Sequence, residues 1–82
     1  APDEGFIIDS LGWLLYRQGR FEQALALLVQ ASRAAPGDPE ILLHLGDVYA
    51  ALGNRGGAGA AYKAALEARP PPMLRKRIEA KR

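Results

Sequence analysis

The sequence predicts an all-α fold built from two tandem helix–turn–helix hairpins, and two observations lead to this prediction. The first is composition: alanine and leucine dominate, threonine is absent, and apolar residues make up 49% of the chain, a mixture that favours helix over strand. The second is an internal repeat with a spacing of about 34 residues, a length typical of stacked helical hairpins. Six residues recur at that offset: Leu11 as Leu45, Gly12 as Gly46, Gly19 as Gly53, Ala24 as Ala58, Ala31 as Ala65 and Pro36 as Pro70.

The repeat also sets the domain organisation. With 82 residues, the chain has room for one small domain. We divide it into a first repeat at about residues 5–38, a second repeat at about 39–72 and a tail at 73–82. Because stacked hairpins leave an apolar face open at the end of the stack, we expect the tail to form a short capping helix.

The first repeat is expected to hold helices at about residues 6–18 and 21–34. Gly19 ends the first helix, since glycine is frequent just past a helix C-terminus, and Pro36 stops the second. Gly12 lacks a side chain and so allows a second helix to approach closely. The expected packing faces are Ile8, Leu11, Gly12 and Leu15 in the first helix and Phe21, Ala24, Leu25, Leu28 and Ala31 in the second.

The second repeat is expected to hold helices at about residues 39–52 and 55–68. Asp38 followed by Pro39 is a strong helix start, because the acid caps the helix and proline fits its first turn. A cluster of three glycines weakens the start of the fourth helix. The expected apolar faces are Leu42, Leu45, Gly46 and Tyr49 in the third helix, Tyr62, Ala65 and Leu66 in the fourth, and Met73, Leu74 and Ile78 in the tail.

These positions resemble the tetratricopeptide repeat, whose pattern places leucine-glycine, tyrosine, glycine, an aromatic residue, two alanines and a proline in each copy. The resemblance covers about residues 5–72. Arg55 departs from it, because the family pattern has an aromatic residue at that turn. The resemblance implies a right-handed superhelix whose concave groove is lined by the first helix of each repeat. It also implies that a peptide or helix of a protein partner binds in that groove.

Helix geometry indicates which side chains would line such a groove. At about 100° per residue, five side chains of the first helix point away from its packing face. Aromatic side chains that a core does not need are candidate anchors for a partner, and acidic ones could favour a basic ligand. The candidate contacts are Phe6, Asp9, Trp13, Tyr16 and Arg17 in the first helix and Leu43 and Asp47 in the third. Two interpretations of Trp13 stay open: contact with a ligand, or packing against a neighbouring repeat or a second copy.

The segment at residues 9–13, which reads Asp-Ser-Leu-Gly-Trp, is also similar to the last repeats of long bacterial tetratricopeptide proteins. Some of those proteins are envelope scaffolds. This similarity implies that the chain is part of a larger scaffold. It leaves the compartment open between the cytoplasm and, for an envelope protein, the periplasm. It does not name the partner.

Catalytic, metal and membrane functions find little support in the residues. The chain has no cysteine and a single histidine, His44, so no set of metal ligands is at hand and no metal or cofactor is expected. Ser10 and Ser32 lie in no nucleophile pattern, so we do not expect an enzyme. No apolar run approaches the roughly 18 residues of a membrane-spanning helix.

Two other functions are alternatives to partner binding. Self-association is one, because two repeats and a cap are fewer than the three or more units usual for a stable stack, and a homodimer would cover the open face. Nucleic-acid binding is the other, and it rests on the five basic residues in 75–82. No aromatic residues are interleaved with them and residues 1–74 are slightly acidic, which argues against nucleic acid as a partner.

Overall fold

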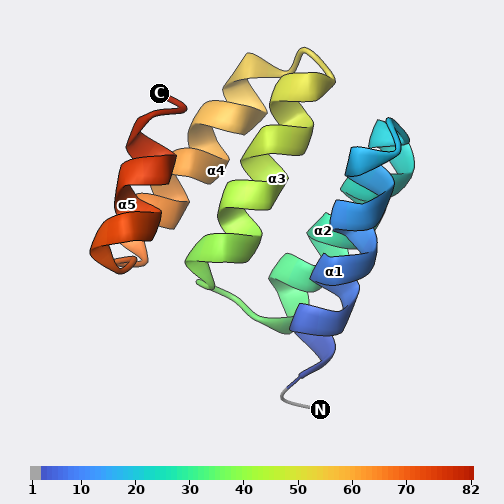
Figure 1. Ribbon diagram of the computed structural model, residues 1–82, viewed down its shortest axis with the longest axis horizontal. Helices are drawn as coiled ribbons and strands as arrows, with labels where there is room; N and C mark the ends of the chain where they lie inside the picture. The colour runs from blue at the N-terminus through green and yellow to red at the C-terminus, as the bar shows by residue number, and fades with distance from the viewer. Residues whose placement is uncertain (1–2) are drawn as a thin grey trace.

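The computed structural model describes residues 3–82 and is all-α over that range; Ala1 and Pro2, at the start of the chain, lie outside the described residues. The predicted fold class is confirmed: two antiparallel hairpins are followed by a short helix (Figure 1). None of the described helices is long and apolar enough to cross a membrane. The helices are α1 (Glu4–Arg17), α2 (Phe21–Ala34), α3 (Pro39–Ala51), α4 (Arg55–Glu67) and α5 (Pro72–Glu79).

The turns form where the sequence places the helix-ending residues. Gly19 and Gly53, one repeat apart, both have a φ of +79°, a left-handed conformation that side-chain-bearing residues rarely adopt. The side chain of Asp38 accepts hydrogen bonds from the backbone N–H groups of Glu40 and Ile41, each at 3.0 Å. This cap satisfies two donors that the first turn of α3 would otherwise leave unpaired.

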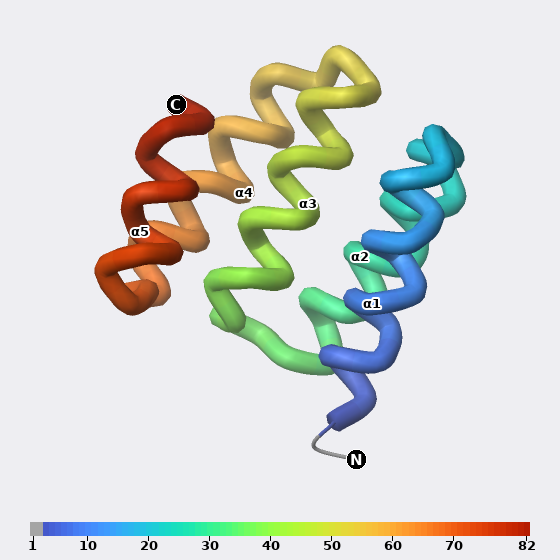
Figure 2. The backbone as a smooth tube through the Cα atoms, in the orientation of Figure 1, coloured from blue at the N-terminus to red at the C-terminus, as the bar shows by residue number. Residues whose placement is uncertain are grey.

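The hairpins stack side by side in chain order. In Figures 1 and 2, α1, α3 and α5 lie nearer the viewer and α2 and α4 lie behind them. Glycine sets the close approach within each hairpin, because a Cβ added at Gly12 would meet the side chain of Leu28, and one added at Gly46 would meet the ring of Tyr62. Because α1, α3 and α5 lie on the same side of the molecule in both figures, these three helices form one wall.

Two apolar clusters hold the stack together. One joins the hairpins and the other joins the second hairpin to α5, so the expected capping role of the tail helix is confirmed by the complete burial of Ile78. The first cluster contains Ala24, Leu28, Leu45, Val48 and Ala61. The second contains Leu43, Ala58, Tyr62, Ala65 and Ile78.

Two side chains that were expected on packing faces are exposed instead. Leu11 is exposed because it faces the open end of the stack, where none of the described elements covers it. Met73 is 82% exposed, since α5 turns Leu74 and Ile78, but not Met73, toward the second hairpin.

The glycine cluster does not prevent α4 from starting at Arg55. The side chain of Asn54 accepts a hydrogen bond from the backbone N–H of Gly57 at 2.8 Å, which caps the helix. Gly57 itself lies against the ring of Tyr49, where a Cβ would come within 2.9 Å of ring carbons. One of the three glycines therefore serves packing, and the intrinsic cost of glycine in a helix is offset locally.

Candidate partner-binding surface

Three aromatic side chains of α1 form what we call the aromatic row: Phe6, Trp13 and Tyr16. They lie at helical spacing, seven and three residues apart, so they share one side of α1. The rings of Trp13 and Tyr16 are stacked, with centroids 4.5 Å apart and planes 14° apart. Phe6 is half exposed, and Trp13 and Tyr16 are partly exposed. The row therefore offers apolar ring surface to a second molecule.

His44 of α3 holds Trp13, the middle residue of the aromatic row, in place. Its ring stacks on Trp13 with centroids 4.0 Å apart, and its Nδ1 lies 2.8 Å from Oδ1 of Asp9 on α1. Asp9 and His44 are both buried. This contact links the first helices of the two hairpins and fixes the orientation of the indole, because a partner on each side limits its rotation.

A second polar link joins α3, α4 and the end of the chain. The hydroxyl of Tyr62 donates a hydrogen bond to Oδ1 of Asp47 at 2.6 Å, and Nζ of Lys81 lies 3.3 Å from the same oxygen. Burial of the phenol, together with its hydrogen bond to the Asp47 carboxylate, raises the pKa of Tyr62 above its ordinary value of 10.0. The tyrosine thus stays protonated and continues to donate at any physiological pH.

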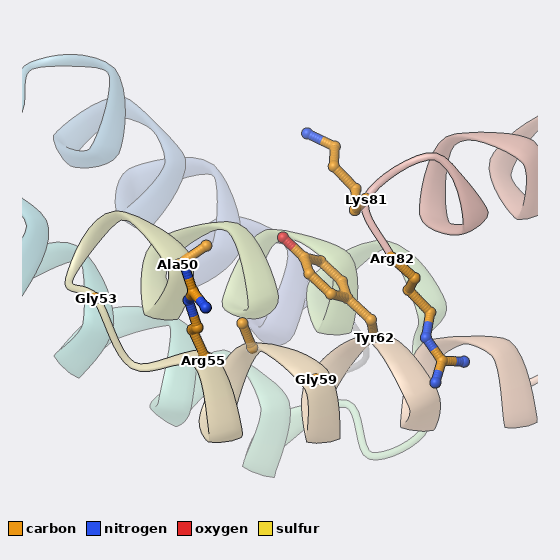
Figure 3. Close-up of a pocket in the computed structure, with 8 residues that line it drawn as sticks. Ala50, Gly53, Arg55, Gly59, Tyr62, Lys81 and Arg82 are labelled. Atoms are coloured by element: carbon orange, nitrogen blue, oxygen red, sulfur yellow. The ribbon is translucent and has the colours of Figure 1, made fainter.

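An open cavity of about 690 Å³ lies beside this second link. Its floor is made of small residues, and three basic side chains stand around it (Figure 3). In Figure 3 the Tyr62 ring projects from α4 between Arg55 on one side and Arg82 on the other. The lining residues are Ala50, Gly53, Arg55, Ala58, Gly59, Tyr62, Lys81 and Arg82. Since that lining includes no carboxylate, the cavity suits an anionic group better than a cationic one.

The structure divides the seven candidate contacts into two groups. Phe6, Trp13, Tyr16 and Arg17 expose surface on α1, as a groove contact requires. The remaining three are buried within the chain: Leu43, Asp9 and Asp47.

Each of the three buried candidates contacts another part of the same chain. Leu43 is fully buried in the cluster that contains Ile78, because α5 covers it, so the expectation that Leu43 is exposed for a partner is wrong. The carboxylate of Asp9 contacts the ring of His44. The carboxylate of Asp47 accepts a hydrogen bond from Tyr62 and pairs with Lys81. These two carboxylates therefore act as links between helices.

The sequence interpretation missed the cavity and the role of His44. The sequence predicts Tyr62 on a packing face, and the structure shows that its hydroxyl also donates a hydrogen bond to Asp47. Lys81 lies one repeat length after Asp47, and opposite charges at that offset are the signal that could have paired them. Asp9 and His44 are separated by 35 residues, and the same reasoning could have found them. Within residues 3–82 no cluster of His, Cys, Asp or Glu could hold a metal ion.

Comparison with known proteins agrees with this architecture. The family model described as "Tetratricopeptide repeat" matches residues 10–71, and the chain belongs to that family of helical repeats. A protein of Pseudomonas aeruginosa, "TPR repeat-containing protein PA4667", is 46% identical over 46 residues, which are 56% of this chain and 8% of that protein. The chain thus spans a small part of the length of this relative. No solved structure matches the chain.

The link between Tyr62 and Asp47 has a consequence for stability at high pH. We expect Tyr62→Phe to lower the free energy of unfolding by about 1–2 kcal/mol at neutral pH, because it removes a buried hydrogen bond to a carboxylate. In the wild type, stability should fall as the pH rises above about 10, since the unfolded chain loses the phenolic proton before the folded one does. Urea unfolding between pH 7 and 11 measures both effects. The prediction fails if the variant loses stability above pH 10 as steeply as the wild type.

Proposed function

We propose that the chain is a protein–protein interaction module that binds a segment of a partner protein against α1, as part of a larger scaffold. Tetratricopeptide repeats are generally protein–protein interaction modules, and the match over residues 10–71 supports that general role here. The observation that carries the finer proposal is the stacked and partly exposed pair of Trp13 and Tyr16. The surface of this pair is apolar and is held in a fixed orientation. Tyr16 also packs against the first apolar cluster, whereas Trp13 packs in neither cluster.

The charged side chains of the chain narrow the chemistry of the partner. The carboxylates of Asp9 and Asp47 are buried and already engaged, so they give little attraction to a basic ligand. The charged side chains that line the cavity, Arg55, Lys81 and Arg82, are basic instead. We therefore propose a partner segment that places an apolar or aromatic side chain on the aromatic row and carries acidic residues, rather than the basic ligand that the sequence favoured.

The structure supports catalysis and nucleic-acid binding less than it supports partner binding. The repeat family is non-catalytic, which supports the expectation that the chain is not an enzyme. In the tail, Arg75 pairs with Glu79 at 3.3 Å and Lys81 pairs with Asp47, so two of its five basic side chains already have acidic partners. This arrangement favours a capping role over contact with nucleic acid.

The proposed role of Trp13 can be tested with a displayed library of random peptides. We expect the wild-type protein to enrich peptides with aromatic and acidic residues, and Trp13→Ala to bind the enriched peptides roughly 30-fold or more weakly, as loss of an interface anchor does. Trp13 is the single tryptophan of the chain, so a bound peptide should also shift its fluorescence emission. Titration of that emission gives the wild-type affinity, and a labelled peptide gives the affinity of the variant.

Two controls separate binding from folding. Trp13→Phe keeps an aromatic face against His44 and should retain most of the affinity, and Met73→Ala, far along the chain on α5, should retain all of it. Circular dichroism should show unchanged helix content in every variant. Equal affinity of the wild type and Trp13→Ala for the selected peptides would reject the site, and no enrichment of peptides would reject the proposed function.

A further inference from the structure

The cavity beside Tyr62 exists because the second repeat departs from the first at the residues that line it. One repeat length earlier in the chain, the equivalent positions hold large apolar side chains. Tyr16 and Leu25 pack against the first apolar cluster, and the ring centroids of Tyr16 and Phe21 lie 5.6 Å apart. The counterparts of Tyr16, Leu25 and Phe21 in the second repeat are Ala50, Gly59 and Arg55, in that order. Two of these changes remove side-chain volume, and the third adds a positive charge.

The end of the chain departs from the repeat in the same direction. Val48, fully buried in the first cluster, corresponds to Arg82, and Asp47 corresponds to Lys81. The junction between the two hairpins is thus packed with apolar side chains, whereas the equivalent junction between α4 and the residues after α5 is an open cavity with basic side chains around it (Figure 3). Half of the lining, from Arg55 to Tyr62, belongs to α4, the second helix of its hairpin, so the cavity is not the groove that the first helices were expected to line.

Two of the three basic side chains around the cavity have no acidic partner. Among residues 3–82, the side chains of Arg55 and Arg82 form no hydrogen bond or ion pair. Nζ of Lys81 lies 3.3 Å from Oδ1 of Asp47, and this pair balances the charge of the lysine. The side chains around the cavity therefore carry an excess of two positive charges, both on guanidinium groups.

We propose that this cavity is a binding site for a phosphate group. The planar guanidinium group matches the oxygen atoms of phosphate with paired hydrogen bonds. A phosphate monoester carries close to two negative charges at neutral pH, which balances both arginines, whereas a single carboxylate would leave one of them unbalanced. The cavity volume of about 690 Å³ lies in the range of small-ligand pockets, so there is room for the group that carries the phosphate.

Titration of the 82-residue chain with inorganic phosphate tests the proposal, with chloride lowered in step to keep the ionic strength constant. We expect saturable changes in the amide chemical shifts of Gly53, Arg55 and Gly59, which line the cavity. Trp13→Ala should bind phosphate as the wild type does, because Trp13 does not line the cavity, so this result is independent of the proposed partner-binding surface. The absence of saturable changes at these amides would overturn the proposal.

Charge variants distinguish the cavity from general attraction to the basic tail. Arg55→Gln and Arg82→Gln should each weaken phosphate binding about tenfold or more, because each removes charge-assisted hydrogen bonds. Arg77→Gln is the matched control, since it removes the same charge from an exposed position of α5 outside the lining, and it should leave the affinity nearly unchanged. Equal losses in Arg77→Gln and Arg82→Gln would show that the cavity is not the site.

A variant that fills the cavity tests its shape. Gly59→Leu introduces the residue that the first repeat has at Leu25 and should abolish phosphate binding, whereas Gly59→Ala should retain it, because nothing lies within 4 Å of a Cβ added there. Leucine favours helix, and circular dichroism should show that both variants keep their helix content. Unchanged affinity in a folded Gly59→Leu variant would overturn the proposal.

Two short peptides identify what carries the phosphate group. One contains phosphoserine, and the other has glutamate in its place. Displacement of inorganic phosphate by the phosphoserine peptide, with tighter binding, would support the proposal with a phosphorylated protein segment as the source. Weaker binding of that peptide than of inorganic phosphate would support it with a small phosphate compound as the source. Binding of the glutamate peptide as tight as that of the phosphoserine peptide would overturn the assignment to phosphate.

Discussion

Replacing Gly46 with alanine is expected to lower the free energy of unfolding by about 2–3 kcal/mol, as overpacking of a close helix crossing does. Gly46 lies where α3 crosses α4, and a Cβ added there would collide with the ring of Tyr62. That ring has little freedom to move, because its hydroxyl is held by Asp47 and the side chain is buried in the second apolar cluster. The strain would separate α3 from α4 or break the hydrogen bond.

Urea unfolding followed by circular dichroism measures this loss, and a second glycine provides a matched control. Gly59 is also helical, but nothing lies within 4 Å of a Cβ added there. Gly59→Ala should therefore raise the free energy of unfolding by about 0.5–1 kcal/mol, because alanine restricts the unfolded chain and favours helix. If Gly46→Ala and Gly59→Ala shift the unfolding midpoint in the same direction, the crossing is not packed as described.

The helices could be predicted from the sequence because their signals are local. Gly19, Gly53 and Asp38 act on their own neighbours, so each turn and each start falls within a residue or two of the expected place. The distribution of exposure could not be predicted as well. Leu11 and Leu45 are equivalent in the repeat, yet one is exposed and the other is buried, because burial depends on whether a hairpin precedes.

The candidate site, too, has features that depend on a single helix and features that depend on how the hairpins pack. The exposure of Phe6, Trp13 and Tyr16 follows from the angular position of each residue on a single helix, which the sequence contains. The burial of Asp9 and Asp47 depends on partners one repeat away, His44 and Lys81, whose approach is set by how the hairpins stack. Side chains at equivalent positions therefore take different roles, and only the packed chain distinguishes a contact surface from a link between helices.

The second large effect is expected at Ile78, the side chain through which α5 closes the stack. Ile78 is fully buried in a cluster with Leu43 and Tyr62, so Ile78→Ala should lower the free energy of unfolding by about 2–4 kcal/mol through lost burial and the cavity left behind. It should also expose Leu43, which a hydrophobic dye would detect as increased fluorescence. Both follow from the position of α5, which covers the end of the stack as a third hairpin would.

Met73→Ala is the matched control, because Met73 lies on the same helix, is also apolar and is 82% exposed. It should change the free energy of unfolding by less than about 0.5 kcal/mol. If Ile78→Ala cost no more than Met73→Ala, α5 would not be a cap, and Leu43 would return as a candidate contact for the partner. The two variants thus decide whether the binding surface ends at α1 or continues along α3, since α5 and a partner cannot cover the same side chain.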